Sequence, residues 1–114
     1  MKSLDVLKHI VKRLRDEDLR WDAILELKVL DDPQWVLPLI KLLGHSDWVV
    51  RWCVSEKLGD MGDARAIGPL VQALGDSEAL VRRNLEKALV KLGRLSVGPL
   101  VLRYASTQLL VRQQ

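Results

Sequence analysis

Apolar residues recur along this chain at the three- and four-residue spacing of amphipathic helices, in one block after another. Short polar turns such as Asp31-Asp32-Pro33 and Gly75-Asp76-Ser77 separate the blocks. The pattern predicts seven helices and the start of an eighth, over about 3–14, 17–30, 33–43, 47–61, 64–74, 78–92 and 95–105, with a final segment from 107 to 114. We therefore expect an all-α protein.

These blocks form a repeat with a period of about 31 residues. Shifting residues 61–93 back by 31 aligns Pro69-Leu70 with Pro38-Leu39, and Val81-Arg82 with Val50-Arg51. Self-similarity at such a period is typical of a solenoid, in which helix pairs stack on copies of themselves. We predict a single domain over 1–114 with repeats at about 1–30, 31–62, 63–93 and 94–114, of which the last is incomplete.

The repeated motif contains Gly-Asp, Pro-Leu, Ala-Leu, Val-Arg and Leu-Gly pairs, which in its best copy are Gly62-Asp63, Pro69-Leu70, Ala73-Leu74, Val81-Arg82 and Leu92-Gly93. This pattern resembles the phycobilisome-lyase type of HEAT-like repeat. The resemblance implies a right-handed α-α superhelix of about three and a half to four helix pairs. That family includes bilin lyases, relatives without lyase activity and many adaptor proteins, so the resemblance indicates the fold more specifically than the function.

Each second helix of a predicted pair carries an arginine four residues after an acidic residue, in the pairs Asp16/Arg20, Asp47/Arg51 and Glu78/Arg82. This spacing places both side chains on one helix face. The resemblance implies that these arginines form a ladder between neighbouring repeats. We interpret them as structural residues rather than as a binding site.

The second helices have a predicted core stripe that contains Leu19, Ala23 and Leu27 in the first repeat. A residue two positions further on is rotated by roughly 200°, so it points away from that core. The positions that point away, with those nearly on the same side, are Trp21, Leu25, Val29, Trp48, Val49, Trp52, Glu56, Asp60, Ala79, Leu80, Arg83, Lys87 and Lys91. In the family that this chain resembles, second helices line the concave face that binds partners.

We therefore predict a groove that is aromatic and apolar near Trp21 and Leu25 and basic near Lys87 and Lys91. Clustered apolar side chains turned away from a core tend to mark interaction sites, and Trp and Arg are favoured anchors. The alternative interpretation is that Trp21 and Trp52 pack on each other and only close this face. Trp35, near the start of its helix, is interpreted as packing rather than as a site.

The charge balance bears on the class of partner, and the cysteine content bears on the compartment. Lys and Arg exceed Asp and Glu by 18 to 15, and the excess lies in Arg94, Arg103 and Arg112, so the balance does not favour nucleic acid. The single cysteine, Cys53, cannot form an internal disulfide, and no apolar run is long enough to span a membrane. We expect a cytoplasmic protein.

Catalysis has little support in the sequence. The two histidines, His9 and His45, have no partner at metal-ligand spacing, and no glycine-rich phosphate loop or GxSxG motif is present. Cys53 lies inside a predicted helix, where a cysteine usually packs as a small apolar residue. We predict no enzymatic activity, no metal and no cofactor.

The leading hypothesis is a non-catalytic scaffold or adaptor that binds another protein in the groove. One alternative, implied by the resemblance, is a bilin-lyase-related subunit that handles tetrapyrroles. Another is binding of an anionic polymer along Arg83, Lys87 and Lys91, which would depend steeply on salt. Self-association through the groove or through the incomplete last repeat is also open.

Overall fold

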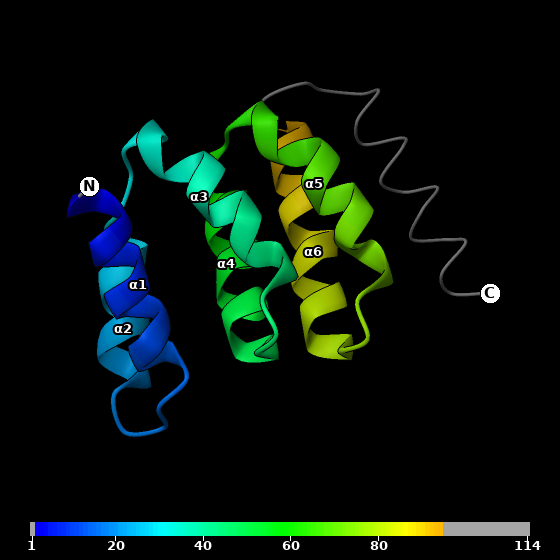
Figure 1. Ribbon diagram of the computed structural model, residues 1–114. Helices are drawn as coiled ribbons and strands as arrows, with labels where there is room; N and C mark the ends of the chain where they lie inside the picture. Colours follow the sequence, from blue (N-terminus) through cyan, green and yellow to red (C-terminus); the bar gives the residue numbers. More distant parts are fainter. Residues whose placement is uncertain (1, 95–114) are drawn as a thin grey trace.

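The computed structural model describes residues 2–94, which form helix pairs arranged side by side (Figure 1). In Figure 1 the first helix of each pair lies in front of the second. The elements are α1 (Lys2–Leu14) with α2 (Arg20–Lys28), then η1 (Pro33–Trp35), α3 (Val36–Lys41) and η2 (Leu42–Gly44) with α4 (Trp48–Met61), then η3 (Ala64–Ala66), α5 (Ile67–Gln72) and η4 (Ala73–Gly75) with α6 (Ala79–Leu92). The prediction of an all-helical chain is confirmed for these residues, and the predicted helix over 95–105 and the segment 107–114 lie outside them.

The first helices of the second and third pairs begin with a 3-10 turn instead of a full α-helical turn. Asp32 and Asp63 start these turns, and each side chain accepts a hydrogen bond of 2.9 Å from the backbone N–H two residues later. Pro38 and Pro69 have no N–H that could bond to the carbonyl four residues earlier. The residues before them therefore form the tighter 3-10 hydrogen bonds. The recurring prolines thus shape the first helices, as the sequence indicates.

Helix α2 is shorter than predicted, because it begins at Arg20 rather than near residue 17. The Asp16 side chain accepts a 2.8 Å hydrogen bond from the Asp18 N–H, and the Asp16 carbonyl accepts one of 3.2 Å from the Leu19 N–H. Aspartate competes in this way for backbone groups that a helix would otherwise use. The prediction that Leu19 belongs to the core is therefore wrong, since Leu19 precedes the helix and is 44% exposed.

The other two residues of that predicted stripe, Ala23 and Leu27, are buried. Fully buried apolar side chains come from every pair, including Ile10 and Leu14 of α1, Val54 and Leu58 of α4, and Leu85 of α6. They belong to one continuous cluster, and its burial supplies the main driving force for folding. Trp35 is also buried in this cluster, which confirms that it packs rather than forms a site.

Glycines follow the last residues of α4 and α6. Gly62 has φ 67°, a left-handed conformation that ends α4 at almost no steric cost for glycine. Helix α6 ends at Leu92, as the sequence predicts, and Gly93 is its C-cap. Unlike Gly62, Gly93 keeps right-handed helical angles of φ −60° and ψ −41°, and its N–H bonds to the carbonyl of Leu89 one turn back.

Candidate functional site

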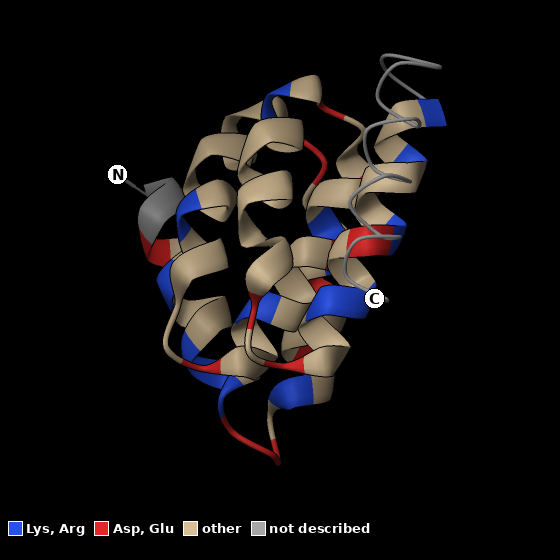
Figure 2. Cartoon of the chain, turned by 90° about the vertical axis from the view of Figure 1, so that its right-hand side faces the viewer, with Lys and Arg blue, Asp and Glu red and all other residues tan. Residues whose placement is uncertain are grey.

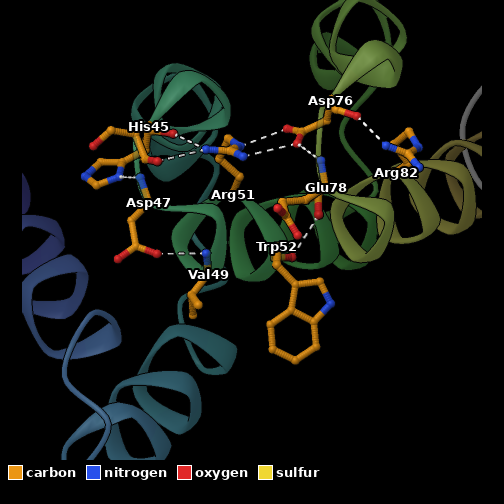
Figure 3. A network of polar contacts seen from close by, with 10 residues as sticks. His45, Asp47, Val49, Arg51, Trp52, Asp76, Glu78 and Arg82 are labelled. Carbon is orange, nitrogen blue, oxygen red and sulfur yellow. Dashed lines mark hydrogen bonds and ion pairs between the residues drawn. The ribbon is translucent and has the colours of Figure 1, made fainter.

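The arginines of the second helices hold the turns before these helices in place, as Figure 3 shows for Arg51 and Arg82. Each donates to the backbone carbonyl six residues before it, in the bonds Arg20 to Leu14 at 2.8 Å, Arg51 to His45 at 2.7 Å and Arg82 to Asp76 at 2.7 Å. Arg51 also donates from Nε and Nη2 to the two carboxylate oxygens of Asp76, at 2.8 and 3.1 Å. The ladder implied by the resemblance thus joins the second pair to the third.

Asp76 serves two donors at once. Besides Arg51, its Oδ1 accepts a 3.0 Å hydrogen bond from the Glu78 N–H at the start of α6. Burial alone would raise the pKa of Asp76, but the hydrogen bonds from Arg51 and from the Glu78 backbone outweigh it and leave that pKa lowered. One repeat earlier, His45 takes the same place, and its Nδ1 accepts a 2.9 Å hydrogen bond from the Asp47 N–H.

The surface formed by α2, α4 and α6, which we call the second-helix face, holds two adjacent clefts. The first, about 190 Å³, lies between α2 and α4 and is lined by Trp21, Ile24, Leu27, Lys28, Trp52, Cys53, Glu56, Lys57 and Asp60. The second, about 270 Å³, lies between α4 and α6 and is lined by Glu56, Gly59, Asp60, Asn84, Lys87, Ala88 and Lys91. Because both clefts share Glu56 and Asp60, they form one continuous track across the three helices.

This track gathers six of the residues predicted for the groove, namely Trp21, Trp52, Glu56, Asp60, Lys87 and Lys91. Leu25, Leu80 and Arg83 are exposed but do not line either cleft. Trp48 lies beside the track, with its ring centroid 6.3 Å from that of Trp52 and the rings tilted by 52°.

The prediction that Val49 belongs to the groove is wrong, because its side chain is only 7% exposed and packs in the core. Helix α4 lies in the middle of the described residues and contacts α2, α3 and α6. A helix that is covered from several sides buries a wide arc, so both Val50 and its neighbour Val49 face protein.

The exposed apolar surface is concentrated on α2 and its C-terminal end. Trp21 is 74% exposed, Leu25 59% and Val29 73%, and their spacing of four residues places them in one stripe. Trp21 and Trp52 line the same cleft, but the aromatic ring contact on this face joins Trp48 to Trp52. Trp21 is therefore too exposed to serve only to close the face.

A comparison with protein families identifies HEAT repeats over residues 4–93. The chain belongs to the HEAT-repeat family. No curated protein matched it. HEAT repeats commonly serve as scaffolds for protein interactions. In this chain the second helices of the repeats are α2, α4 and α6, which form the face that carries the two clefts and the apolar stripe.

The charge of the track changes from one helix to the next in this HEAT-repeat chain. Lys91 of α6 forms an ion pair with Asp60 of α4 across the second cleft, and both groups are about half exposed. Arg83 and Lys87 have no ion-pair partner among residues 2–94. Lys and Arg residues recur along the length of α6 (Figure 2). The track therefore runs from apolar at α2, through carboxylates at α4, to basic at α6.

Sequence reasoning missed several lining residues. Lys57 is nearly buried beneath the first cleft, where its Nζ donates a 2.9 Å hydrogen bond to the Lys28 carbonyl. Burial lowers the pKa of Lys57, against the opposite influence of the nearby carboxylates of Asp60 and Asp31. Asn84 donates from Nδ2 to the Trp52 carbonyl at 3.0 Å. A polar residue beside a predicted core position, as at Lys57 and Asn84, is the signal that could have pointed to them.

Cys53 is the cysteine that lines the first cleft. Burial, with a smaller effect of Glu56, raises the pKa of the Cys53 thiol to about 11, so the thiol stays protonated at neutral pH and is a poor nucleophile. Residues 2–94 contain no group of three or more His, Cys, Asp or Glu side chains that could hold a metal ion. None of the helices within that range is long and apolar enough to cross a membrane.

Proposed function

We propose that this HEAT-repeat chain is a non-catalytic interaction module that binds another protein along the second-helix face. The observation that carries the proposal is the exposed stripe of Trp21, Leu25 and Val29 beside a cleft that also contains Trp52. Large exposed apolar clusters mark interaction surfaces more often than chance, and Trp is the most frequent energetic anchor in interfaces.

The charge order of the face sets the kind of partner surface that fits it. An apolar side chain of the partner would lie against Trp21 at the first cleft, and a basic group would lie near Glu56. Carboxylates of the partner would meet Arg83 and Lys87, which lack an intramolecular ion pair within the described residues. This arrangement favours a partner with alternating charge over a uniformly anionic polymer, because two carboxylates line the same track.

Replacement of Trp21 by alanine tests the proposal. Because the Trp21 ring is 74% exposed, we expect the Trp21→Ala variant to keep the helical content and melting temperature of the wild type. A hot-spot residue contributes about 2 kcal/mol or more to binding, so the affinity for a partner should fall by roughly 30-fold. Affinity capture with tagged wild-type and variant protein, followed by titration of each captured partner, measures the loss.

Leu37→Ala is the matched control, since Leu37 is a similarly exposed apolar residue, at 55%, but lies on the first helix α3. Partners retained by Leu37→Ala and lost by Trp21→Ala support the proposal, whereas equal capture by both variants contradicts it. Size-exclusion chromatography with light scattering on the same proteins shows whether the captured partner is a second copy of the chain.

The finer features inferred from the sequence belong to the same proposal. We infer a single domain over 1–114, wound as a right-handed superhelix of about three and a half to four helix pairs of the phycobilisome-lyase type. The three pairs within residues 2–94 and the repeated motif pairs from Gly62-Asp63 to Leu92-Gly93 support this inference. The tetrapyrrole-handling alternative gains no specific support from the two clefts.

A further inference from the structure

A third cleft lies on the other side of the molecule, between the first helices α1 and α3. This α1–α3 cleft has a volume of about 420 Å³ and is lined by Leu7, Lys8, Val11, Lys12, Arg15, Pro38, Lys41, Leu42 and His45. It shares no residue with the two clefts of the second-helix face. Any ligand that it binds is therefore separate from the partner proposed above.

The α1–α3 cleft combines an apolar floor with a cationic rim. Leu7, Val11, Pro38 and Leu42 are buried or half-buried and form the apolar part of the lining. Four cationic side chains surround them, three from the first pair and one from α3, namely Lys8, Lys12, Arg15 and Lys41. All four cationic residues are exposed.

Most of this positive charge has no counterpart within the described residues. No carboxylate in that range lies within 4 Å of the amino groups of Lys8, Lys12 or Lys41, while Arg15 Nε lies 3.4 Å from Asp47 Oδ2. Lys8 and Lys12 are four residues apart on one helix, a spacing at which like charges repel. The helix dipole favours Lys12 in the last turn of α1, but it does not account for Lys8 or for Lys41 on the opposite bank.

The basic rim is also not a by-product of the repeat. One period further along the chain, the positions of Lys41 and His45 are occupied by Gln72 and Asp76. The equivalent bank between α3 and α5 thus loses its cation and gains a carboxylate that is already engaged by Arg51. The positive charge is specific to the interval between α1 and α3.

We propose that the α1–α3 cleft binds an acidic amphipathic helix of a partner protein. Such a helix would lay its apolar stripe on Val11, Pro38 and Leu42 and would place carboxylates on both sides, toward Lys8 and Lys12 on one bank and Lys41 on the other. Helices that dock in grooves use this combination of an apolar stripe and charged flanks.

Two other anionic ligands match the cleft less well. A fatty acid carries one carboxylate, which cannot meet cations on both banks. A nucleic acid would bring many phosphates but little apolar surface for the floor, and no aromatic side chain lines the cleft to stack a base. The two-sided rim and the apolar floor together favour a helix with several carboxylates.

The test uses a fluorescein-labelled helical peptide with leucines at positions i, i+3, i+4 and i+7 and glutamates on both flanks, at low salt. Fluorescence anisotropy with the full chain should give a dissociation constant in the micromolar range. The double variant Lys12→Glu with Lys41→Glu should bind at least about tenfold more weakly, since each change turns an attraction into a repulsion. Both lysines are exposed, so circular dichroism should show unchanged helicity.

Matched controls separate this surface from the second-helix face. Lys87→Glu changes an equally exposed lysine of α6, and Trp21→Ala removes the anchor of the proposed function, so both variants should bind the peptide like the wild type. If Trp21→Ala abolishes binding while the double variant retains it, the peptide occupies the other face and this proposal fails, although the proposed function stands.

Three further results would overturn the proposal. They are no binding of the glutamate peptide, equal binding of a peptide in which lysines replace the glutamates, and undiminished binding by the double variant. Vesicles of phosphatidylserine and phosphatidylcholine and a single-stranded oligonucleotide complete the experiment. Capture of either one, without binding of the peptide, would assign the cleft to that ligand instead.

Discussion

At the scale of single residues, Arg51 and Asp76 form the strongest polar link between the second and third helix pairs. The two side chains come from segments 25 residues apart and are 14% and 8% exposed. Arg51 donates to the carbonyls of His45 and Ser46 as well, and Asp76 accepts from the Glu78 N–H. With so many of their hydrogen bonds made, neither charge is left buried without a partner.

Replacing Asp76 by alanine should lower the free energy of unfolding by roughly 3 kcal/mol, because the Arg51 guanidinium would remain buried without its carboxylate and the Glu78 N–H would lose its hydrogen bond. Urea denaturation at neutral pH measures this loss. The matched control is Asp60→Asn, which affects the exposed pair with Lys91 and should cost at most about 1 kcal/mol. Equal losses for the two variants would contradict the role assigned to Asp76.

The same carboxylate makes stability depend on pH. The pKa of Asp76 is lower in the folded chain than its unfolded value of about 3.9, so its stabilisation is fully present above that value and is lost as pH falls through the folded pKa. We therefore expect urea midpoints of the wild type to fall between pH 5 and strongly acidic solution. The Asp76→Asn variant has no carboxylate to protonate at this position, so its urea midpoint should fall less over the same range.

Residue identity could be predicted from the sequence only where the repeat fixes it. The recurring Val-Arg pair pointed to a ladder of arginines between repeats, and among the described residues Arg51 makes such a link, whereas Arg20 and Arg82 bond to carbonyls of their own pairs. Its partner could not be predicted, because Asp47, four residues before Arg51, caps α4 through the Val49 N–H, while the turn residue Asp76 reaches Arg51 from the next pair. A spacing rule describes neighbours on one helix, whereas this contact depends on how two pairs stack.

At the scale of elements, α4 and α6 approach each other closely at Gly59 and Ala88. A Cβ added at Gly59 would lie 2.8 Å from both the Cα and the Cβ of Ala88. Atoms cannot approach this closely without displacement, so the two helices are in contact through their backbones at this point. The small residues at 59 and 88 therefore set the spacing of the helices that line the second cleft.

Gly59→Ala should destabilise the protein by about 1–3 kcal/mol, since the extra methyl group forces α4 and α6 apart despite the better helix propensity of alanine. Gly68→Ala is the control, because a Cβ at Gly68 meets no atom within 4 Å and the substitution lies inside α5. We expect that variant to be neutral or up to about 1 kcal/mol more stable. Thermal unfolding followed by circular dichroism compares them, and a stabilised Gly59→Ala would refute the close contact.

Helix positions and several helix ends, such as Leu14, Met61 and Leu92, could be predicted from the sequence, but the bounds of α2 could not. The start of α2 was misplaced because the Asp16 side chain bonds to the backbone of its own turn. The end of α6 at Leu92 was predicted correctly, but the backbone angles of its C-cap could not be predicted, because glycine permits a left-handed cap without requiring it, as the contrast between Gly62 and Gly93 shows. Local hydrogen bonds of this kind leave no periodic trace in the sequence.

At the scale of the whole molecule, packing is uneven between the two ends of the described chain. Helices α4 and α6 pack against each other along most of their length, whereas the first pair reaches α4 through fewer contacts of α1 and α2. The most exposed large apolar residues also belong mainly to the first pair and its end, including Trp21, Leu25 and Val29. Less apolar surface is thus buried where the first pair joins the second.

We expect native-state hydrogen exchange to show two levels of protection. Amides of residues 5–28 should exchange through a partial opening of lower free energy, while amides of α4 and α6 should require global unfolding. Measurement of exchange against low concentrations of urea distinguishes the two. Uniform protection of α1 and α6 would show instead that the pairs unfold as one unit.

The arrangement of pairs follows from the period of 31 residues, which is why six of the fourteen residues that line the two clefts of the second-helix face could be predicted. Glu56 and Asp60 were found because stacked repeats bring equivalent helix faces into one surface. The α1–α3 cleft could not be predicted, because the period indicates which helices are neighbours but not whether their side chains fill the space between them. The burial of Val49 was missed for a related reason, because it depends on all the neighbours of α4 at once.

The bond from Lys57 to the Lys28 carbonyl bears on the order in which the chain acquires structure during translation. The last carbonyl of α2 accepts this hydrogen bond from the following repeat, 29 residues downstream in the sequence. While the ribosome has released α1 and α2 alone, that carbonyl and the negative end of the helix lack the cation that later covers them. The first pair therefore reaches its final stability only after much of α4 has emerged, so the amino-terminal end is made first and completed later.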